Sequence, residues 1–309
     1  MLTAFQAKWG VEQWVAFLKD KEIPVLPRTR DLILEITETR RDTVAPRELA
    51  DVLFSDPYLA LKLLRRAEGH RSNVLGHETT TALATVLQTG LDDMLRTVRD
   101  SALTSADLKG QTDCAFEAVM AGSIARHWAA ARADISAEEV AMAALLAESG
   151  ELLLWHFAPE LPQRVLDALR DGKARRTAEA QQLVCGFSFK VLTLTLAEAW
   201  QLPHLVTLLI RGSDTLRANI ARLATDAARH IIYNPENPAI PADVLAIHEL
   251  LPGVSFEHLV SALPIPPDYA EVVLAHLHAN DVSQVPAAST GTDGAKDPEP
   301  GQGGPPAAG

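Results

Sequence analysis

The sequence predicts an all-α protein folded as a compact multi-helix bundle. Apolar residues recur every three or four positions through most of the chain, and the strict alternation typical of strands is rare. Prolines and capping residues stand where helices would begin, and glycines stand where helices would end. Hydrophobic residues make up 47% of the 309 residues, which is enough to fill a substantial core.

Charge and cysteine content limit the classes of function. The chain has 28 Lys and Arg against 40 Asp and Glu, and its net charge of -12 argues against binding bulk nucleic acid through phosphate contacts. Cys114 and Cys185 lie far apart in apolar surroundings, so we expect core residues rather than a zinc site or a redox pair. No stretch approaches the roughly 18 uninterrupted apolar residues of a membrane span. These features predict a cytoplasmic protein with no membrane span.

The N-terminal part begins with short amphipathic segments. Residues 1–20 place Trp14 and Leu18 among charged residues, a pattern typical of a helix packed on the body of the protein. Pro24 and Pro27 then impose an extended entry into the next helix.

The next helices begin at prolines. Pro46 suits the first turn of one helix. Asp56 can accept hydrogen bonds from the free N–H groups of another helix, whose first position is Pro57. We expect a polar break at residues 65–73, after which a helical pattern resumes and ends at Gly90.

A long helix after Asp113 has the clearest spacing. Its apolar stripe is expected to be buried and consists of Phe116, Met120, Ile124 and Trp128. Small residues beside this stripe favour a closely packed neighbouring helix; they are Ala118, Ala121, Gly122 and Ala125. Ser136 and Glu139 have the spacing of a capping box, which would begin the helix that carries residues 143–148.

The C-terminal half continues the helical pattern. Helices are expected over residues 178–200, 205–210 and 216–233. A proline-rich turn at 234–241 separates them from C-terminal helices within 242–280. The last segment, 284–309, is rich in Gly, Pro and Ala and is expected to be a disordered tail.

Three segments have a specific order and spacing. They are Ile23-Pro24-Val25-Leu26-Pro27, the stretch 49–65 with its Asp56-Pro57 pair, and the stretch 81–91 with its Gly90. Together they make the chain resemble the HDOD family, the HD-related output domains, over roughly residues 23–203. The resemblance implies an HD-like bundle, with an HDOD-like domain at 21–210 and C-terminal helices at 211–283 that complete it.

The chain departs from the family pattern at several positions. Members usually have Asn-Ser where residues 68–72 lie and Ser-Ile in place of Thr80 and Thr81. Many retain a His-Asp remnant where this chain has Ala147 and Glu148. Functions that depend on these positions are therefore not carried over.

The resemblance also locates the metal positions of an HD enzyme. Such an enzyme holds its metal with a histidine, an adjacent His-Asp pair and a later aspartate, because imidazole and carboxylate groups must converge on the ion. The corresponding positions here are Ala118, Ala147 with Glu148, and Asp226, or Thr225 if the match shifts by one residue. Alanine binds no metal, so we expect no catalytic residue, no bound metal and no cofactor.

Other polar residues offer weaker candidates. Asp226 and His230 are four apart on one helical face, which suits two metal ligands but is commoner for a surface pair. Glu148 and Glu151 could form a carboxylate pair, although a solvated helix end is the simpler interpretation. A phosphate or an acidic partner could dock on the basic cluster Arg65, Arg66 and Arg71, unless this cluster is only a solvated loop.

Two functions compete. The first is a non-enzymatic bacterial signal-transduction module that binds another protein or a small ligand, nucleotides included. The resemblance implies that its partner is a signalling protein, such as a two-component protein or one that makes or degrades cyclic dinucleotides. The second is a residual metal-dependent HD-type phosphohydrolase with altered ligands, using Glu148, Asp226 and His230.

Overall fold

The computed structural model describes residues 2–3, 5–41, 43–69, 78–105 and 107–284. Within these ranges the chain is helical, and its only extended pairing is an isolated parallel bridge between Val25 and Leu103. The predicted all-α fold is confirmed. The expected tail lies outside the described residues.

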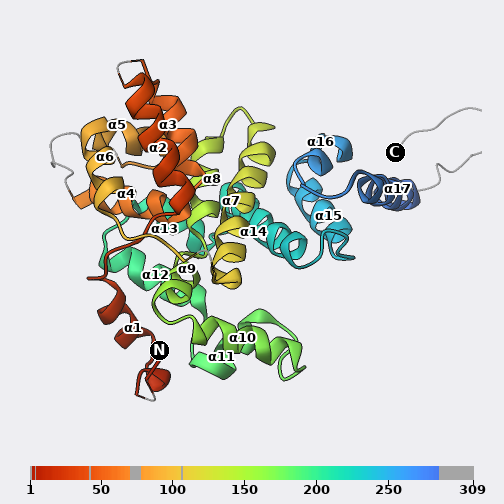
Figure 1. Cartoon of the computed structure of the whole chain (residues 1–309). Helices are drawn as coiled ribbons and strands as arrows, with labels where there is room; N and C mark the ends of the chain where they lie inside the picture. Colours follow the sequence, from red (N-terminus) through yellow and green to blue (C-terminus); the bar gives the residue numbers. More distant parts are fainter. Residues whose placement is uncertain (1, 4, 42, 70–77, 106, 285–309) are drawn as a thin grey trace, which may run out of the picture.

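Five helices form the N-terminal end of the bundle, on the upper left of Figure 1. They are α2 (Pro27–Arg40), α3 (Pro46–Phe54), α4 (Pro57–Gly69), α5 (Ala82–Thr89) and α6 (Leu91–Asp100). A proline occupies the first position of α2, α3 and α4, where its missing N–H is not needed. Gly90 ends α5 with a φ of 75°, which a residue with a side chain rarely adopts.

Asp56 joins the start of α4 to the chain before α2. Its Oδ1 accepts hydrogen bonds from the N–H groups of Tyr58 and Leu59, both at 3.0 Å, as predicted for a helix cap. Its Oδ2 also accepts from the N–H of Leu26 at 2.8 Å. Burial raises the pKa of this carboxyl group. Asp56 is therefore a tertiary link as well as a cap.

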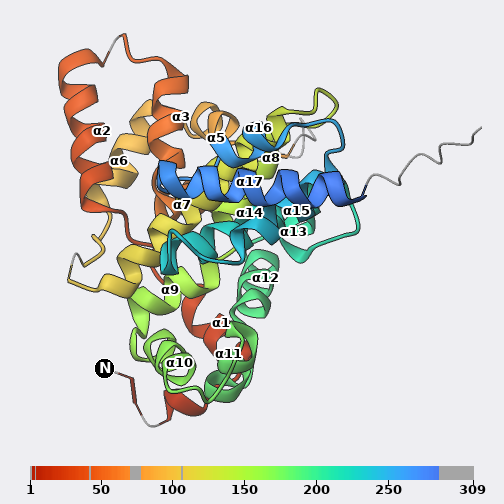
Figure 2. The ribbon, with the colours of Figure 1, turned by 90° about the vertical axis from the view of Figure 1, so that its right-hand side faces the viewer.

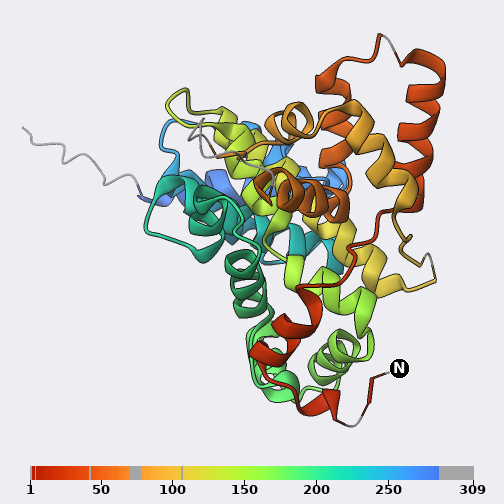
Figure 3. The same cartoon turned by 90° about the vertical axis from the view of Figure 1, so that its left-hand side faces the viewer.

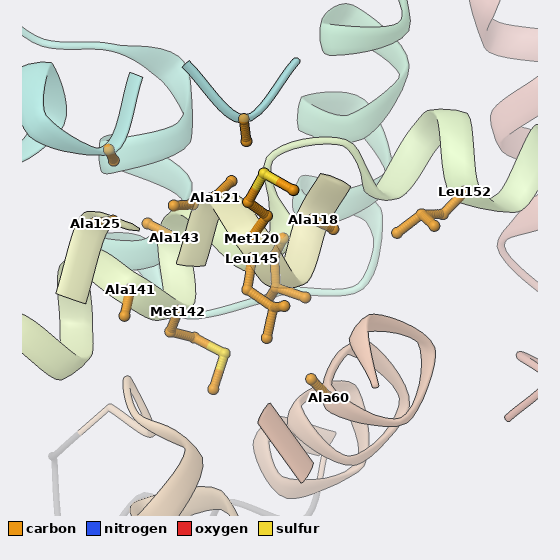
Figure 4. Packing of buried hydrophobic residues seen from close by; sticks show 14 of the residues in the cluster. Ala60, Ala118, Met120, Ala121, Ala125, Ala141, Met142, Ala143, Leu145 and Leu152 are labelled. Carbon is orange, nitrogen blue, oxygen red and sulfur yellow. The ribbon is translucent and has the colours of Figure 1, made fainter. Parts of the chain in front are cut away.

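The centre of the bundle is α7 (Lys109–Ala130), packed against α8 (Ala137–Leu146) and α14 (Leu216–Tyr233). Figure 4 shows small side chains of α7, such as Ala121 and Ala125, gathered with Ala143 of α8. A Cβ at Gly122 would lie 3.2 Å from the carbonyl oxygen of Ala141. The predicted close approach of a neighbouring helix is confirmed.

The structure corrects two local predictions. Phe116 is 56% exposed, so only Met120, Ile124 and Trp128 of the expected stripe are buried. Ser136 caps α8, but the carboxylate of Glu139 bonds Thr80 and Arg217 instead of completing a capping box. For Glu139, bonds to residues distant in the sequence replace the expected bond to the backbone of Ser136.

A further correction concerns helix boundaries. The helix expected over 178–200 is divided into α11 (Thr177–Cys185) and α12 (Phe189–Ala199), because Gly186 adopts a left-handed conformation with φ 76°. The helix expected to include residues 143–148 ends at Leu146. A second helix, α9 (Ser149–Phe157), begins after the break.

The remaining helices surround this centre. Figures 2 and 3 show α1, α10 and α11 at the lower end of the molecule and α12 above them. The bounds are η1 (Gln6–Lys8), α1 (Val11–Leu18), α10 (Glu160–Arg170), α13 (His204–Arg211), α15 (Ile240–Leu250), α16 (Phe256–Ser261) and α17 (Pro267–Gln284). Trp14 and Leu18 of α1 are buried, and α1 packs on α12. The three C-terminal helices pack on one another and, through α15, on α14.

The stretch Ala137–Phe157, formed by α8 and α9, is long and apolar enough to cross a membrane by length and composition. No such stretch was expected from the sequence. The most apolar window of this stretch is 72% buried inside the fold. The apolar character of α8 and α9 is thus accounted for by their place in the core.

Candidate functional site

Three of the four residues that the family resemblance matches to HD metal positions lie at one cavity. Ala147, Glu148 and Asp226 line it, together with Thr225, whereas Ala118 is buried within α7 and is not among its lining residues. The cavity has a volume of about 300 Å³. Its walls come from α8 and from the consecutive helices α11, α12, α13 and α14.

The break between α8 and α9 sets the position of Glu148. Ser149 Oγ donates to the carbonyl of Leu146 at 2.7 Å, which holds the turn. The N–H of Gly150 donates to Thr193 Oγ1 of α12 at 2.9 Å. A Cβ at position 150 would lie 2.8 Å from the carbonyl oxygen of Phe189, so only glycine allows this close approach. The turn therefore depends on contact with α12.

An arginine binds the carboxylates at this break. Arg229 of α14 contacts Glu148 Oε1 through Nη2 at 2.6 Å and Glu117 Oε1 through Nε at 3.1 Å. The side chains of Arg229, Glu148 and Glu117 are 24%, 15% and 12% exposed. Charge-assisted bonds of this kind are strong when they are shielded from water. The Glu148 carboxylate accordingly raises the pKa of the guanidinium well above its usual value.

Glu117 and a further carboxyl group near Arg229, Glu151, hold their protons more tightly than usual. Burial raises the pKa of Glu117 to about 8, although the guanidinium of Arg229 opposes the shift. Burial, followed by repulsion from Glu148, raises the pKa of Glu151 to about 7. Glu148 and Glu151 were expected at a solvated helix end, and the structure contradicts this because Glu148 is held by Arg229.

The arrangement does not suit the metal implied by HD chemistry. The Glu148 carboxylate already has a cation from the protein itself, the guanidinium of Arg229, which also contacts Glu117. In the described part of the chain, no group of three or more His, Cys, Asp or Glu side chains is placed to hold a metal ion.

The proposed pair of Asp226 and His230 is divided between other partners. Asp226 forms an ion pair with Arg222 at 3.1 Å. His230 Nδ1 lies 2.6 Å from Asp243 Oδ2, and this bond raises the pKa of His230. Asp226 lines the cavity but His230 does not. The structure thus does not bring Glu148, Asp226 and His230 together as one ligand set.

The basic cluster after Leu64 lies elsewhere. The helix α4 continues through Gly69, so Arg65 and Arg66 are helical rather than part of a loop. The Arg65 guanidinium stacks over the Trp200 ring at 4.9 Å, and Arg66 donates to Thr97 Oγ1 at 3.1 Å. Both line a separate cavity of about 360 Å³ with Lys62. Arg71 lies outside the described residues.

Sequence reasoning missed Glu117, Arg229 and Lys190. The position of Glu117 next to Ala118, on a face of the helix otherwise made of small and apolar residues, was a usable signal of a buried charge in need of a partner. Arg229 lies three residues after Asp226 and had no comparable signal. Lys190 lines the cavity. In the sequence it lies within the helix expected over residues 178–200, and nothing around it indicated a site.

The HDOD domain profile matches residues 23–215, which is more than half of the chain. The chain belongs to the HDOD family. The HDOD match ends just before α14, so Asp226 and Arg229 come from the helix that follows it.

Solved structures share this HDOD architecture at low sequence identity. A virulence factor from Campylobacter jejuni subsp. jejuni aligns with a TM-score of 0.66 and 16% identity, covering 85% of this chain and 99% of that one. The MmoQ response regulator from Methylococcus capsulatus str. Bath aligns with a TM-score of 0.60 and 19% identity, covering 79% and 99%. Both likenesses concern the fold. No curated protein matches the sequence.

Proposed function

We propose that this HDOD protein is a non-enzymatic module of bacterial signal transduction that works in the cytoplasm by binding another protein or a small ligand. One observation carries the proposal. At the positions where an HD enzyme needs its His-Asp pair, Ala147 offers no ligand and Glu148 is bound by Arg229. The scaffold keeps a cavity there but not the residues that the chemistry requires.

The relatives support a signalling role. The two structures described above are named as a response regulator and a virulence factor, and both have the same fold. The family resemblance favours a signalling protein as the partner, such as a two-component protein or one that makes or degrades cyclic dinucleotides. The net charge of -12 favours a protein or small-molecule partner over nucleic acid.

The alternative is a residual phosphohydrolase with altered ligands. Its basis is that Glu148 and Asp226 line the same cavity. To act as metal ligands, they would have to leave Arg229 and Arg222.

Metal analysis and an activity assay separate the two functions. The purified full chain is dialysed against Mn²⁺ and Zn²⁺. Its metal content and its hydrolysis of linear and cyclic nucleotides are then measured. We expect substoichiometric metal and no turnover above buffer, while affinity capture from the native cell retains a specific signalling protein. Stoichiometric metal with turnover that Asp226→Ala abolishes would overturn the proposal.

A further inference from the structure

We infer that the cavity at the degenerate HD positions binds a small organic anion, with one phosphate or carboxylate group on an apolar body no larger than a mononucleotide. The inference rests on the proposed function and deepens it, because such a compound would be the signal that the module senses. Four features of the cavity lead to it.

Lys190 provides a cation that the protein leaves available. It lines the cavity at the start of α12 and is exposed. In the described part of the chain, it has no hydrogen-bond or ion-pair partner, and its Nζ lies near Gly212 at the neighbouring turn. A lysine ammonium in this position acts as a point charge for a phosphate or carboxylate.

The charges around the cavity leave an excess of one positive charge. Its lining includes Lys190, Arg222 and Arg229 as cations, with Glu148 and Asp226 as anions. The two arginines are matched by these carboxylates, at 3.1 Å for Arg222 and 2.6 Å for Arg229. The ammonium of Lys190 is therefore the cation of this lining that is left to pair with an anionic group of a ligand.

Part of the cavity lining is apolar. It includes Ala143 of α8, Ala221 of α14, and Leu209 and Ile210 of α13. Ligand sites combine such a lining with a few polar groups that fix the orientation. The ligand therefore has an apolar part beside its charge, which a bare inorganic ion lacks.

The volume of the cavity limits the size of the ligand. At about 300 Å³, it stands at the lower end of the range for small-molecule sites, roughly 300–1,000 Å³. A cyclic dinucleotide has two phosphates and two nucleosides and exceeds this space. The cavity thus fits a mononucleotide or a smaller compound.

Binding of phenyl phosphate to the full-length protein tests the inference. This probe joins one phosphate to an apolar ring. Isothermal titration calorimetry measures its affinity, and the affinities of inorganic phosphate and of a cyclic dinucleotide are measured for comparison. We expect phenyl phosphate to bind more tightly than either of them, and Lys190→Gln to weaken it about tenfold. Ala147→Leu, which fills the cavity, should abolish binding, whereas Lys173→Gln, on an exposed turn, should leave it unchanged.

The outcomes separate this inference from the proposed function. Absence of binding at about 10 mM, equal weakening by Lys173→Gln, or tighter binding of the cyclic dinucleotide would overturn the anion site as described. Release of phosphate from bound phenyl phosphate would support the site but overturn the non-enzymatic function. Retention of a signalling partner without any anion binding would overturn only the site.

Discussion

Arg229 is the residue that distinguishes this site from a metal centre. Its guanidinium contacts carboxylates from two other elements, Glu117 on α7 and Glu148 between α8 and α9. A buried ion pair contributes little net stability, but removal of one partner leaves an uncompensated charge. The arginine is therefore expected to be needed for the stability of the site, although it lies outside the sequence motifs of the family.

Replacement of Arg229 by Met should destabilise the protein strongly. We expect a loss of about 3 kcal/mol in the free energy of unfolding, the lower end for a broken buried pair because the side chain is 24% exposed. Urea denaturation followed by circular dichroism measures it. The matched control is Arg222→Met, whose pair with Asp226 is exposed and contributes about 0–1 kcal/mol. Equal losses in the two variants would contradict the assignment.

Glu117 should make stability depend on pH. Its pKa in the folded protein is about 8 against an ordinary value of 4.5, so in this window the folded state keeps a proton that the unfolded state releases. The free energy of unfolding therefore falls as the pH rises from 4.5 to 8, and this contribution is lost above 8.

The variant Glu117→Gln isolates this effect. It removes the titration while its amide oxygen can still accept a bond from Arg229, so its stability should fall less steeply between pH 4.5 and 8 than that of the parent. Urea midpoints across the window measure the two slopes. The exposed Glu138→Gln serves as the control and should parallel the parent. Identical slopes for Glu117→Gln and the parent would show that Glu117 titrates normally.

At the scale of elements, the contact between α9 and α12 fixes the turn that carries Glu148. Gly150 meets the backbone of α12 at the carbonyl of Phe189 and the N–H of Thr193. Backbone atoms cannot rotate away as the end of a side chain can, so this approach tolerates no added Cβ. The conformation of the turn is thus set by an element that lies about forty residues later in the chain.

Gly150→Ala should destabilise the protein although alanine favours helices. The added Cβ would lie 2.8 Å from a carbonyl oxygen, and overpacking of this kind costs about 1–3 kcal/mol. Thermal and urea unfolding provide the measurement. In the control, Gly69→Ala at the end of α4, no atom lies within 4 Å of the added Cβ, so the change should be neutral or stabilising. A neutral Gly150→Ala would argue against the close contact.

At the scale of the whole molecule, the N-terminal helix is part of the main core. Trp14 is 1% exposed, and the Trp200 indole N–H donates to the carbonyl of Lys19 at 2.9 Å. We therefore expect the N-terminal helix to unfold together with the rest of the core, in one cooperative transition.

Trp14→Ala should therefore lower the stability of the entire protein. Loss of a buried tryptophan costs about 3–5 kcal/mol, and the transition should remain single. Circular dichroism and tryptophan fluorescence would report the same midpoint. Phe5→Ala, at a site 75% exposed, is the control and should change stability little. Two separate transitions in Trp14→Ala would show that α1 is an independent appendage.

Local signals in the sequence were sufficient for most of the helices. The apolar period identified α14 with its observed bounds, and the Asp56-Pro57 pair marked the start of α4. These features depend on neighbours within one helical turn, which sequence spacing records directly. Phe116 was misplaced because spacing groups residues on one face but does not show which flank of that face is covered, and Cys114, Ala115 and Ala118 beside Phe116 are buried instead.

The sequence by itself determined the all-α class and the HDOD motifs, because each depends on the identity or spacing of residues close in the chain. Only the tertiary structure decided that Arg229 binds Glu117 and Glu148, which lie 112 and 81 positions away. It also decided that Lys190 joins Ala147 and Asp226 at one cavity. These contacts arise from the packing of α7, α8, α12 and α14, and the free energy that selects such packing is shared by the whole core rather than encoded in any local pattern.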